Sequence, residues 1–272
     1  MSGTSLDGID LVLVEFEFDS VWRFEILNTE TVTYNSKWEV ILKNLVTYSL
    51  PELRQIDKDY TNYLAGVILN FIKKYSIKNL DAICSHGHTA LHQPENRTTY
   101  QIGNLTVLAK LLNQKVICDF RVQDVELGGQ GAPLVPIGDK KLFSSFDFCL
   151  NLGGFANIST EINEQRIAYD ICPVNIVLNH YVQKLGFNYD DGGKIASSGT
   201  TNQELLEKLN VLPFYRESYP KSLGLEWVRE TVFPMIDSFQ IEIEDILRTF
   251  VEHISIQLGT EINKKTDASV II

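Results

Sequence analysis

The chain is poor in cysteine and lacks both long apolar runs and an excess of positive charge. Its four cysteines (Cys84, Cys118, Cys149 and Cys172) lie far apart, which excludes the close CxxC pairs of zinc and redox sites. No stretch approaches the ~18 consecutive apolar residues of a membrane span, and the first residues lack the basic-then-apolar order of a signal peptide. A formal net charge of −11 argues against general binding to nucleic acid or to an anionic membrane. We therefore expect a cytoplasmic protein with reduced thiols that holds any anionic ligand locally.

The composition is that of a globular protein with a large core. Of the 272 residues, 44% are hydrophobic and 22% are charged, and this length favours two lobes over one large α/β domain. The Gly- and Pro-rich segment Gly128–Gly138 is the natural boundary. The sequence thus predicts a first lobe over residues 1–136 and a second over residues 137–272.

The first lobe begins with a pattern typical of an antiparallel hairpin. Asp10–Phe18 alternates apolar and acidic residues, and Trp22–Tyr34 is a second β-rich run. The next two segments, Trp38–Leu50 and Pro51–Tyr75, have apolar residues spaced three and four apart, which predicts amphipathic helices.

Strands and helices then alternate, which indicates an α/β fold with a parallel sheet. Short apolar runs at Leu80–Ser85 and Lys115–Asp119 flank a helical stretch at Leu105–Leu112. A second round of the same plan follows with strands at Phe146–Leu152, Ala156–Thr160 and Arg166–Tyr169 and a helix at Asn175–Leu185. At both ends the pattern looks cut: we expect a strand ahead of Met1 and a continuation after the β-rich run Ala268–Ile272.

Two glycine turns, one in each lobe, have the composition of phosphate-binding loops. The first is Ser2–Asp10, in which glycines permit close backbone approach, hydroxyls donate, and an aspartate can hold Mg²⁺. The second is Asn151–Ser159, with the pair Gly153-Gly154. The alternatives are an ordinary polar turn for the first and two unrelated hairpins for the pair.

Charged residues follow two of the predicted strands, where α/β proteins place ligand-binding groups. Arg121 and Asp124 follow Lys115–Asp119 and suit a sugar carboxylate and hydroxyls, or else they form a salt bridge with each other. Asp170 follows Arg166–Tyr169 and precedes a turn that opens a helix. It is a candidate general base, or else it only caps that helix.

Three histidines, His86, His88 and His92, lie close together in SHGHTALHQP. A metal site is disfavoured because no carboxylate or cysteine stands near them in the sequence. A polar loop that lines a substrate cleft is the better prediction.

Together these segments resemble the anhydro-N-acetylmuramic acid kinases. The resemblance rests on MSGTSLDGID, SHGHT, DFRVQDVELGGQGAPL, NLGGFANIS, YDDGGKIASSG and PKSLGLEW, in this order. It implies two ribonuclease-H-like lobes around a cleft, the fold of actin, hexokinase and the sugar kinases. It also implies an ATP- and Mg²⁺-dependent carbohydrate kinase, which opens 1,6-anhydro-N-acetylmuramic acid with water and phosphorylates O6 during peptidoglycan recycling.

The resemblance also assigns roles to residues. It makes Asp170 the base that activates water, and it places Asp7 or Asp10 near Mg²⁺. The ATP-binding residues it implies are Gly3, Thr4, Ser5, Leu6, Asp7, Gly8, Ile9, Asp10, Gly153 and Gly154. The substrate-binding residues it implies are His88, Arg121, Asp124 and Asn157. A homodimer is expected from the family alone.

Three segments depart from the family pattern. Ile171–Val174 replaces a Thr-Gly-Pro-Gly turn beside Asp170, Ser85–Thr89 replaces Gly-His-Gly-Gln-Thr, and Ser222–Glu226 loses an arginine. Two rival functions therefore stay open, namely a kinase of another amino sugar and a catalytically inactive nucleotide-binding protein on the same fold. In all readings the partners are small molecules, with no nucleic acid and no membrane.

Overall fold

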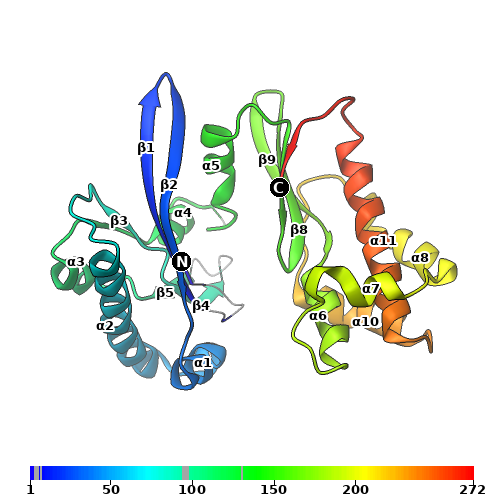
Figure 1. Cartoon of the computed structure of the whole chain (residues 1–272), viewed down its shortest axis with the longest axis horizontal. Coiled ribbons are helices and arrows are strands. Elements are labelled where there is room, and N and C mark those ends of the chain that lie inside the picture. Colours follow the sequence, from blue (N-terminus) through cyan, green and yellow to red (C-terminus); the bar gives the residue numbers. More distant parts are fainter. Residues whose placement is uncertain (3–5, 7, 94–97, 130) are drawn as a thin grey trace. The chain divides into compact units, whose positions relative to one another are not determined.

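The computed structural model describes residues 1, 2, 6, 8–93, 98–129 and 131–272, and it is a mixed α/β protein (Figure 1). The described chain divides into two compact units, Met1–Leu134 and Val135–Ile272. The boundary expected from the sequence lay between residues 136 and 137. None of the helices in the described ranges is long and apolar enough to span a bilayer.

The first unit opens with the expected hairpin. Strand β1 (Ile9–Asp19) pairs antiparallel with β2 (Val21–Val32), and a register shift falls between Leu13 and Val14. The alternation of apolar and acidic residues along β1 gives the ribbon one apolar face, because successive side chains of a strand point to opposite sides.

The helices that follow are separated by caps. Helix α1 (Ser36–Lys43) begins where the side chain of Asn35 accepts a hydrogen bond from the Trp38 amide at 3.0 Å. A short 3₁₀ turn, η1 (Leu45–Thr47), follows, and then α2 (Leu50–Lys74), which starts at a capping box of Ser49 and Glu52. The helix expected over Trp38–Leu50 is confirmed only as far as Lys43, because Asn44 caps it and η1 follows, and the helix expected over Pro51–Tyr75 is confirmed as α2.

A parallel strand pair completes the first unit. Strands β3 (Ile83–Cys84) and β6 (Val116–Ile117) pair in parallel, with α3 (Val107–Leu112) between them in sequence. This confirms the predicted alternation. Between β3 and α3 in the sequence lies a hairpin of β4 (His88–Gln93) and β5 (Thr98–Ile102). Helix α4 (Phe120–Glu126) follows β6.

The second unit is built on a four-stranded sheet in the order β10–β7–β8–β9. Strands β7 (Phe148–Leu152), β8 (Phe155–Ile162) and β9 (Gln165–Pro173) are antiparallel neighbours, and β10 (Val270–Ile271) pairs in parallel with β7. The predicted strands are confirmed, although β9 runs four residues beyond Tyr169. The parallel plan expected for this second round is wrong for β7, β8 and β9, because short turns join them as antiparallel neighbours.

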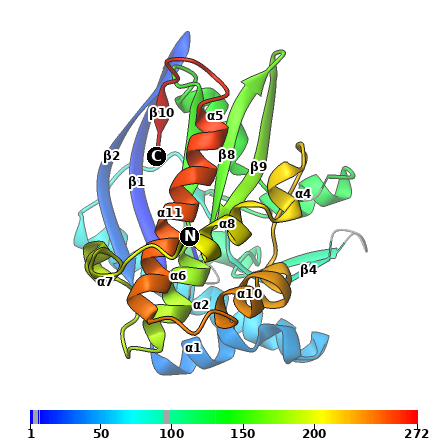
Figure 2. The same cartoon turned by 90° about the vertical axis from the view of Figure 1, so that its right-hand side faces the viewer.

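Helices pack on this sheet to form the core of the second unit. Helix α11 (Ile243–Ile262) lies against β9 and beside α6 (Asn175–Gln183) (Figure 2). The buried cluster between them includes Ile171, Val177 and Phe250. The remaining helical elements are α5 (Val135–Leu142), η3 (Asp191–Gly193), α7 (Lys194–Ser198), α8 (Gln203–Asn210), η4 (Pro213–Arg216), α9 (Leu225–Trp227), η5 (Val228–Val232) and α10 (Phe233–Asp237).

Candidate active site

Three polar side chains form a row across the sheet of the second unit. Asn151 of β7 lies opposite Asn157 of β8, which in turn lies opposite Asp170 of β9. Directly opposite residues of paired strands project from the same face. Since the flanking residues Leu150, Ile158 and Tyr169 belong to the buried core, the row lies on the face turned away from that core.

Asp170 is held by the segment that follows η4. Its amide donates to the carbonyl of Lys221 at 3.2 Å, and its Oδ2 accepts a hydrogen bond from the Leu223 amide at 2.7 Å. Partial burial raises the pKa of the Asp170 carboxyl above its ordinary value, and the Leu223 N–H opposes this shift. The site thus combines an oriented carboxylate with an environment that favours its uptake of a proton.

The helix-capping alternative for Asp170 is wrong. The N-cap of α6 is Val174, which makes no side-chain capping bond, and Asp170 lies inside β9. The turn expected over residues 171–175 is also wrong, because the strand continues to Pro173. Ile171, Cys172 and Val174 are all buried in the core cluster, so the side chains that replace the family's small residues fill the interior of the unit.

The Gly153-Gly154 turn joins β7 to β8 next to this row. The carbonyls of Gly154 and Gly153 accept hydrogen bonds from the amides of Val174 and Asn175, at 2.8 and 3.3 Å, and so tie the turn to the start of α6. A Cβ on Gly154 would meet no atom within 4 Å, and Gly154 does not have a positive φ. Nothing described around Gly154 requires glycine, so the open space there is available to a ligand that approaches the backbone closely.

The first glycine turn is described only in part. Gly3, Thr4, Ser5 and Asp7 lie outside the described residues, and Leu6 is half-buried. Gly8 is needed for packing, since a Cβ there would lie 2.5 Å from the carbonyl oxygen of Val32. The Ile9 side chain is buried, whereas Asp10 is exposed and its Oδ1 accepts a hydrogen bond from the Thr31 hydroxyl at 2.7 Å.

Arg121 and Asp124 lie together on α4, but they do not form the salt bridge considered above. Each binds the backbone of Gly131 instead: Arg121 Nη1 donates to the Gly131 carbonyl and Asp124 Oδ2 accepts from the Gly131 amide, both at 2.7 Å. Gly131 has φ +69° and its added Cβ would lie 2.9 Å from Val125 Cγ2. The two charged side chains therefore fix the start of the connection out of this unit.

His86, which the sequence placed in a polar loop lining a substrate cleft, and Asn104, which sequence reasoning missed, extend this cluster. Arg121 Nε donates to His86 Nε2 at 3.0 Å, and Asn104 Nδ2 donates to the carbonyl of His86 at 3.3 Å and to Asp119 Oδ1 at 3.1 Å. Burial raises the pKa of Asp119 and lowers the pKa of His86. His86 and Asp119 follow β3 and β6, so the carboxyl ends of the parallel pair gather the cluster, as the rule for α/β sheets predicts.

His88 does not lie in a polar loop, so that prediction is wrong. It begins β4 and is only 2% exposed, because the strand turns its side chain into the unit. Its Nδ1 is hydrogen-bonded to the Ser2 hydroxyl at 2.6 Å, and the same hydroxyl contacts the hydroxyl of Tyr34. Burial lowers the pKa of His88 to about 4. In the described ranges no group of three or more His, Cys, Asp or Glu residues is arranged to hold a metal ion.

Comparisons with known proteins agree with the resemblance. A sequence model of the family described as "Anhydro-N-acetylmuramic acid kinase" matches residues 1–270. The chain belongs to this family. Curated relatives of that name are 34% identical in Sulfurimonas denitrificans, 32% in Photobacterium profundum and 35% in a Shewanella strain. These alignments cover 100%, 96% and 93% of this chain and 78%, 72% and 72% of the three relatives.

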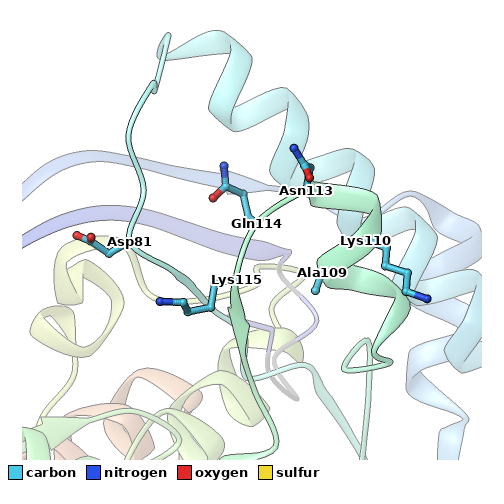
Figure 3. A pocket seen from close by; sticks show the side chains of 6 residues that line it. All are labelled: Asp81, Ala109, Lys110, Asn113, Gln114 and Lys115. Carbon is cyan, nitrogen blue, oxygen red and sulfur yellow. The ribbon is translucent and has the colours of Figure 1, made fainter.

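Membership of the anhydro-N-acetylmuramic acid kinase family directs attention to the two polar groups rather than to a surface pocket elsewhere in the first unit. A pocket of about 460 Å³ lies in the first unit (Figure 3). Its lining consists of Asp81 before β3 and of five residues on α3 and the connection to β6: Ala109, Lys110, Asn113, Gln114 and Lys115. None of the predicted site residues lines this pocket, and backbone hydrogen bonds at the end of α3 join four of its lining residues, Asn113 to Lys110 and Gln114 to Ala109.

Proposed function

We propose that this chain is an ATP-dependent carbohydrate kinase that hydrolytically opens 1,6-anhydro-N-acetylmuramic acid and phosphorylates its O6. The product is N-acetylmuramic acid 6-phosphate, formed during peptidoglycan recycling. The environment of Asp170 carries the proposal, because the chain belongs to this kinase family. The Asp170 carboxylate is half-buried, one of its oxygens accepts a hydrogen bond from the Leu223 amide, and burial raises its pKa. The proposal includes a fold of two ribonuclease-H-like lobes around a cleft.

In the proposed reaction Asp170 acts as a general base. Its Oδ2 is occupied by the Leu223 N–H, so Oδ1 is the oxygen that takes a proton from water. The water oxygen bonds to the anomeric carbon, the bond from that carbon to O6 breaks, and O6 takes the γ-phosphoryl group while ADP leaves. A general base contributes about 10²–10⁴-fold to such a reaction. Burial raises the pKa of Asp170 toward the value of an effective base at neutral pH.

Residues of both glycine turns suit the binding of ATP and Mg²⁺. When bound, these supply the phosphoryl group and neutralise the charge that develops on it. Gly154 leaves its backbone open to close approach, and the exposed Asp10 carboxylate has Oδ2 free of hydrogen bonds to described residues. One or two carboxylates beside phosphate oxygens are a common protein contribution to a Mg²⁺ site. Gly3–Ser5 and Asp7 belong to the same proposed turn.

In the proposed substrate site Arg121 binds the carboxylate of the muramic acid, and Asn157 contacts its hydroxyls. Asn157 lies directly opposite Asp170, and its side chain makes no hydrogen bond to a described residue. Asp124 and His88 also belong to the proposed site. Asp124 accepts a hydrogen bond from the Gly131 amide, and His88 is hydrogen-bonded to the Ser2 hydroxyl. The proposal extends to a cytoplasmic homodimer: the four cysteines are free thiols, as in a reducing compartment, and the dimer follows from the family resemblance.

Asp170→Asn tests the proposal. The parent protein should transfer phosphate from ATP to the anhydro sugar, and the variant should lose about 10²–10⁴-fold in turnover while its sugar affinity, measured by calorimetry, is kept. Open-ring N-acetylmuramic acid is the matched control substrate, because it needs no ring opening. Turnover of the open-ring sugar alone would support a kinase of another amino sugar. ATP binding without any turnover, and no change on Asp170→Asn, would support the inactive protein.

A further inference from the structure

The half-buried guanidinium of Arg121 is fixed at two points but is not neutralised. Its Nη1 donates to the Gly131 carbonyl at 2.7 Å and its Nε donates to His86 Nε2 at 3.0 Å. Among the residues that the structure describes, no carboxylate lies within 4.0 Å of it, and Nη2 has no hydrogen-bond partner. A partly buried positive charge with an unused N–H donor favours the binding of an anion.

The contacts of His86 determine which of its nitrogens carries the proton. An arginine Nε–H can only donate, so Nε2 of His86 must present its lone pair. Nδ1 lies 3.1 Å from the carbonyl of Gly87, which can only accept, so Nδ1 carries the hydrogen. Both contacts are satisfied by one neutral tautomer and by no other state of the ring.

We propose that His86 is a positioning residue: as its neutral Nδ1–H tautomer it accepts from Arg121 and thereby aims Nη2 at the carboxylate of the sugar substrate. This inference rests on the proposed function, because the carboxylate it invokes belongs to that sugar. His86 itself touches neither the sugar nor ATP in this scheme. Its effect is carried entirely by the orientation of the guanidinium.

Protonation of His86 would destroy this arrangement. An imidazolium has no acceptor lone pair, and it would place a second positive charge against Arg121. Among the described residues, the charged and titratable groups that act on the ring are Arg121 on α4, the amino group of Met1 and His88 on β4. Burial is the main cause that lowers the pKa of His86, and the charges of Arg121 and Met1 add to it, so the neutral ring persists to pH values below its ordinary range.

Kinetics of a matched pair of variants test the role. His86→Leu removes the acceptor at similar volume and should raise the KM for the anhydro sugar about 10- to 100-fold, with kcat and the KM for ATP little changed. His86→Gln keeps an acceptor oxygen and should restore a sugar KM near that of the parent. In the parent the sugar KM should rise as pH falls through the pKa of His86, and in His86→Gln this rise should be absent. If both variants raised the sugar KM and the ATP KM equally and lost equal thermal stability, His86 would have a merely structural role and the proposal would be overturned.

Imidazole NMR gives a readout that needs no turnover. In long-range ¹H–¹⁵N spectra of the labelled full chain at pH 7.5, the histidine signal lost in His86→Gln should show a protonated Nδ1 and an unprotonated Nε2. A protonated Nε2 would overturn the proposal even in an active enzyme. If the parent phosphorylates no anhydro sugar, the proposed function fails, and a spectrum with the expected tautomer then supports the His86–Arg121 bond alone and overturns its link to this sugar.

Discussion

The two polar groups described above, one in each unit, are built in opposite ways. Around Arg121 in the first unit, side chains bind one another and the backbone of Gly131, so the positions of its charged groups are set before any ligand arrives. In the second unit, Asn151, Asn157 and Asp170 lie side by side on a sheet, and among the described residues their side chains make a single hydrogen bond, from the Leu223 amide to Asp170. Under the proposed function, this difference corresponds to a preorganised binding group in the first unit and to reactive groups that stay open in the second.

Glycine substitutions give the largest stability test of this contrast. Gly131→Ala forces an L residue into φ +69° with a Cβ 2.9 Å from Val125, and should lower the stability of the protein by about 1–3 kcal/mol. Urea unfolding followed by fluorescence measures this change. An unchanged midpoint would mean that the Gly131 connection is not held as tightly as its hydrogen bonds suggest.

Gly154→Ala should have the opposite pattern. Its Cβ would meet no neighbour within 4 Å, so the unfolding midpoint should stay within about 0.5 kcal/mol of the parent. The methyl group would nevertheless stand between the turn and a phosphate, so the KM for ATP should rise while the KM for sugar does not. A lowered midpoint with unchanged ATP kinetics would contradict the assignment of this turn to the nucleotide.

The pH dependence of stability at Asp170 tests the same contrast, and its expected effect is smaller than that of the glycine substitutions. The folded-state pKa of Asp170 is raised, so folding favours its protonated form. Its contribution to stability is therefore greatest below the unfolded pKa of about 3.9 and is lost as pH rises through the folded pKa. Asp170→Asn should raise the melting temperature at neutral pH and lose that advantage toward pH 4. A variant less stable than the parent at neutral pH would show that the Leu223 bond outweighs the burial of the charge.

Local patterns predicted the elements better than the contacts between them. The alternation along β1 predicted this strand from neighbouring residues alone. The caps Asn35 and Ser49 are equally local signals, but apolar spacing alone extended the expected helix past Ser49. The β4–β5 hairpin was missed because the polar His86–His92 stretch looked like a loop. Its pairing with Thr98–Ile102 buries His88 against Ser2, a contact between residues 86 positions apart.

The candidate site shows the same limit. The sequence placed Asp170 at the end of a strand, whereas β9 continues to Pro173. Its bond to Leu223, which lies 53 residues further along the chain, could not be predicted. Arg121 and Asp124 were expected to bind a ligand or each other, whereas both bind the backbone of Gly131. Backbone partners carry no side-chain signature in a sequence, so only the folded chain reveals them.

The pairing of β8 with β9 contains an offset whose consequence reaches beyond the site. Asn157 pairs with Asp170 and Ala156 with Cys172, so Ile171 is an extra residue in β9. The strand therefore keeps Tyr169 and Ile171 in the core by ordinary alternation and then places Cys172 there as well. Deletion of one residue at this point would shift the alternation of the strand by one position. Side chains on one side of the deletion would then exchange the core face of the sheet for the opposite face. Either the Asp170 carboxylate would turn into the core, or the core residues beyond it would turn out.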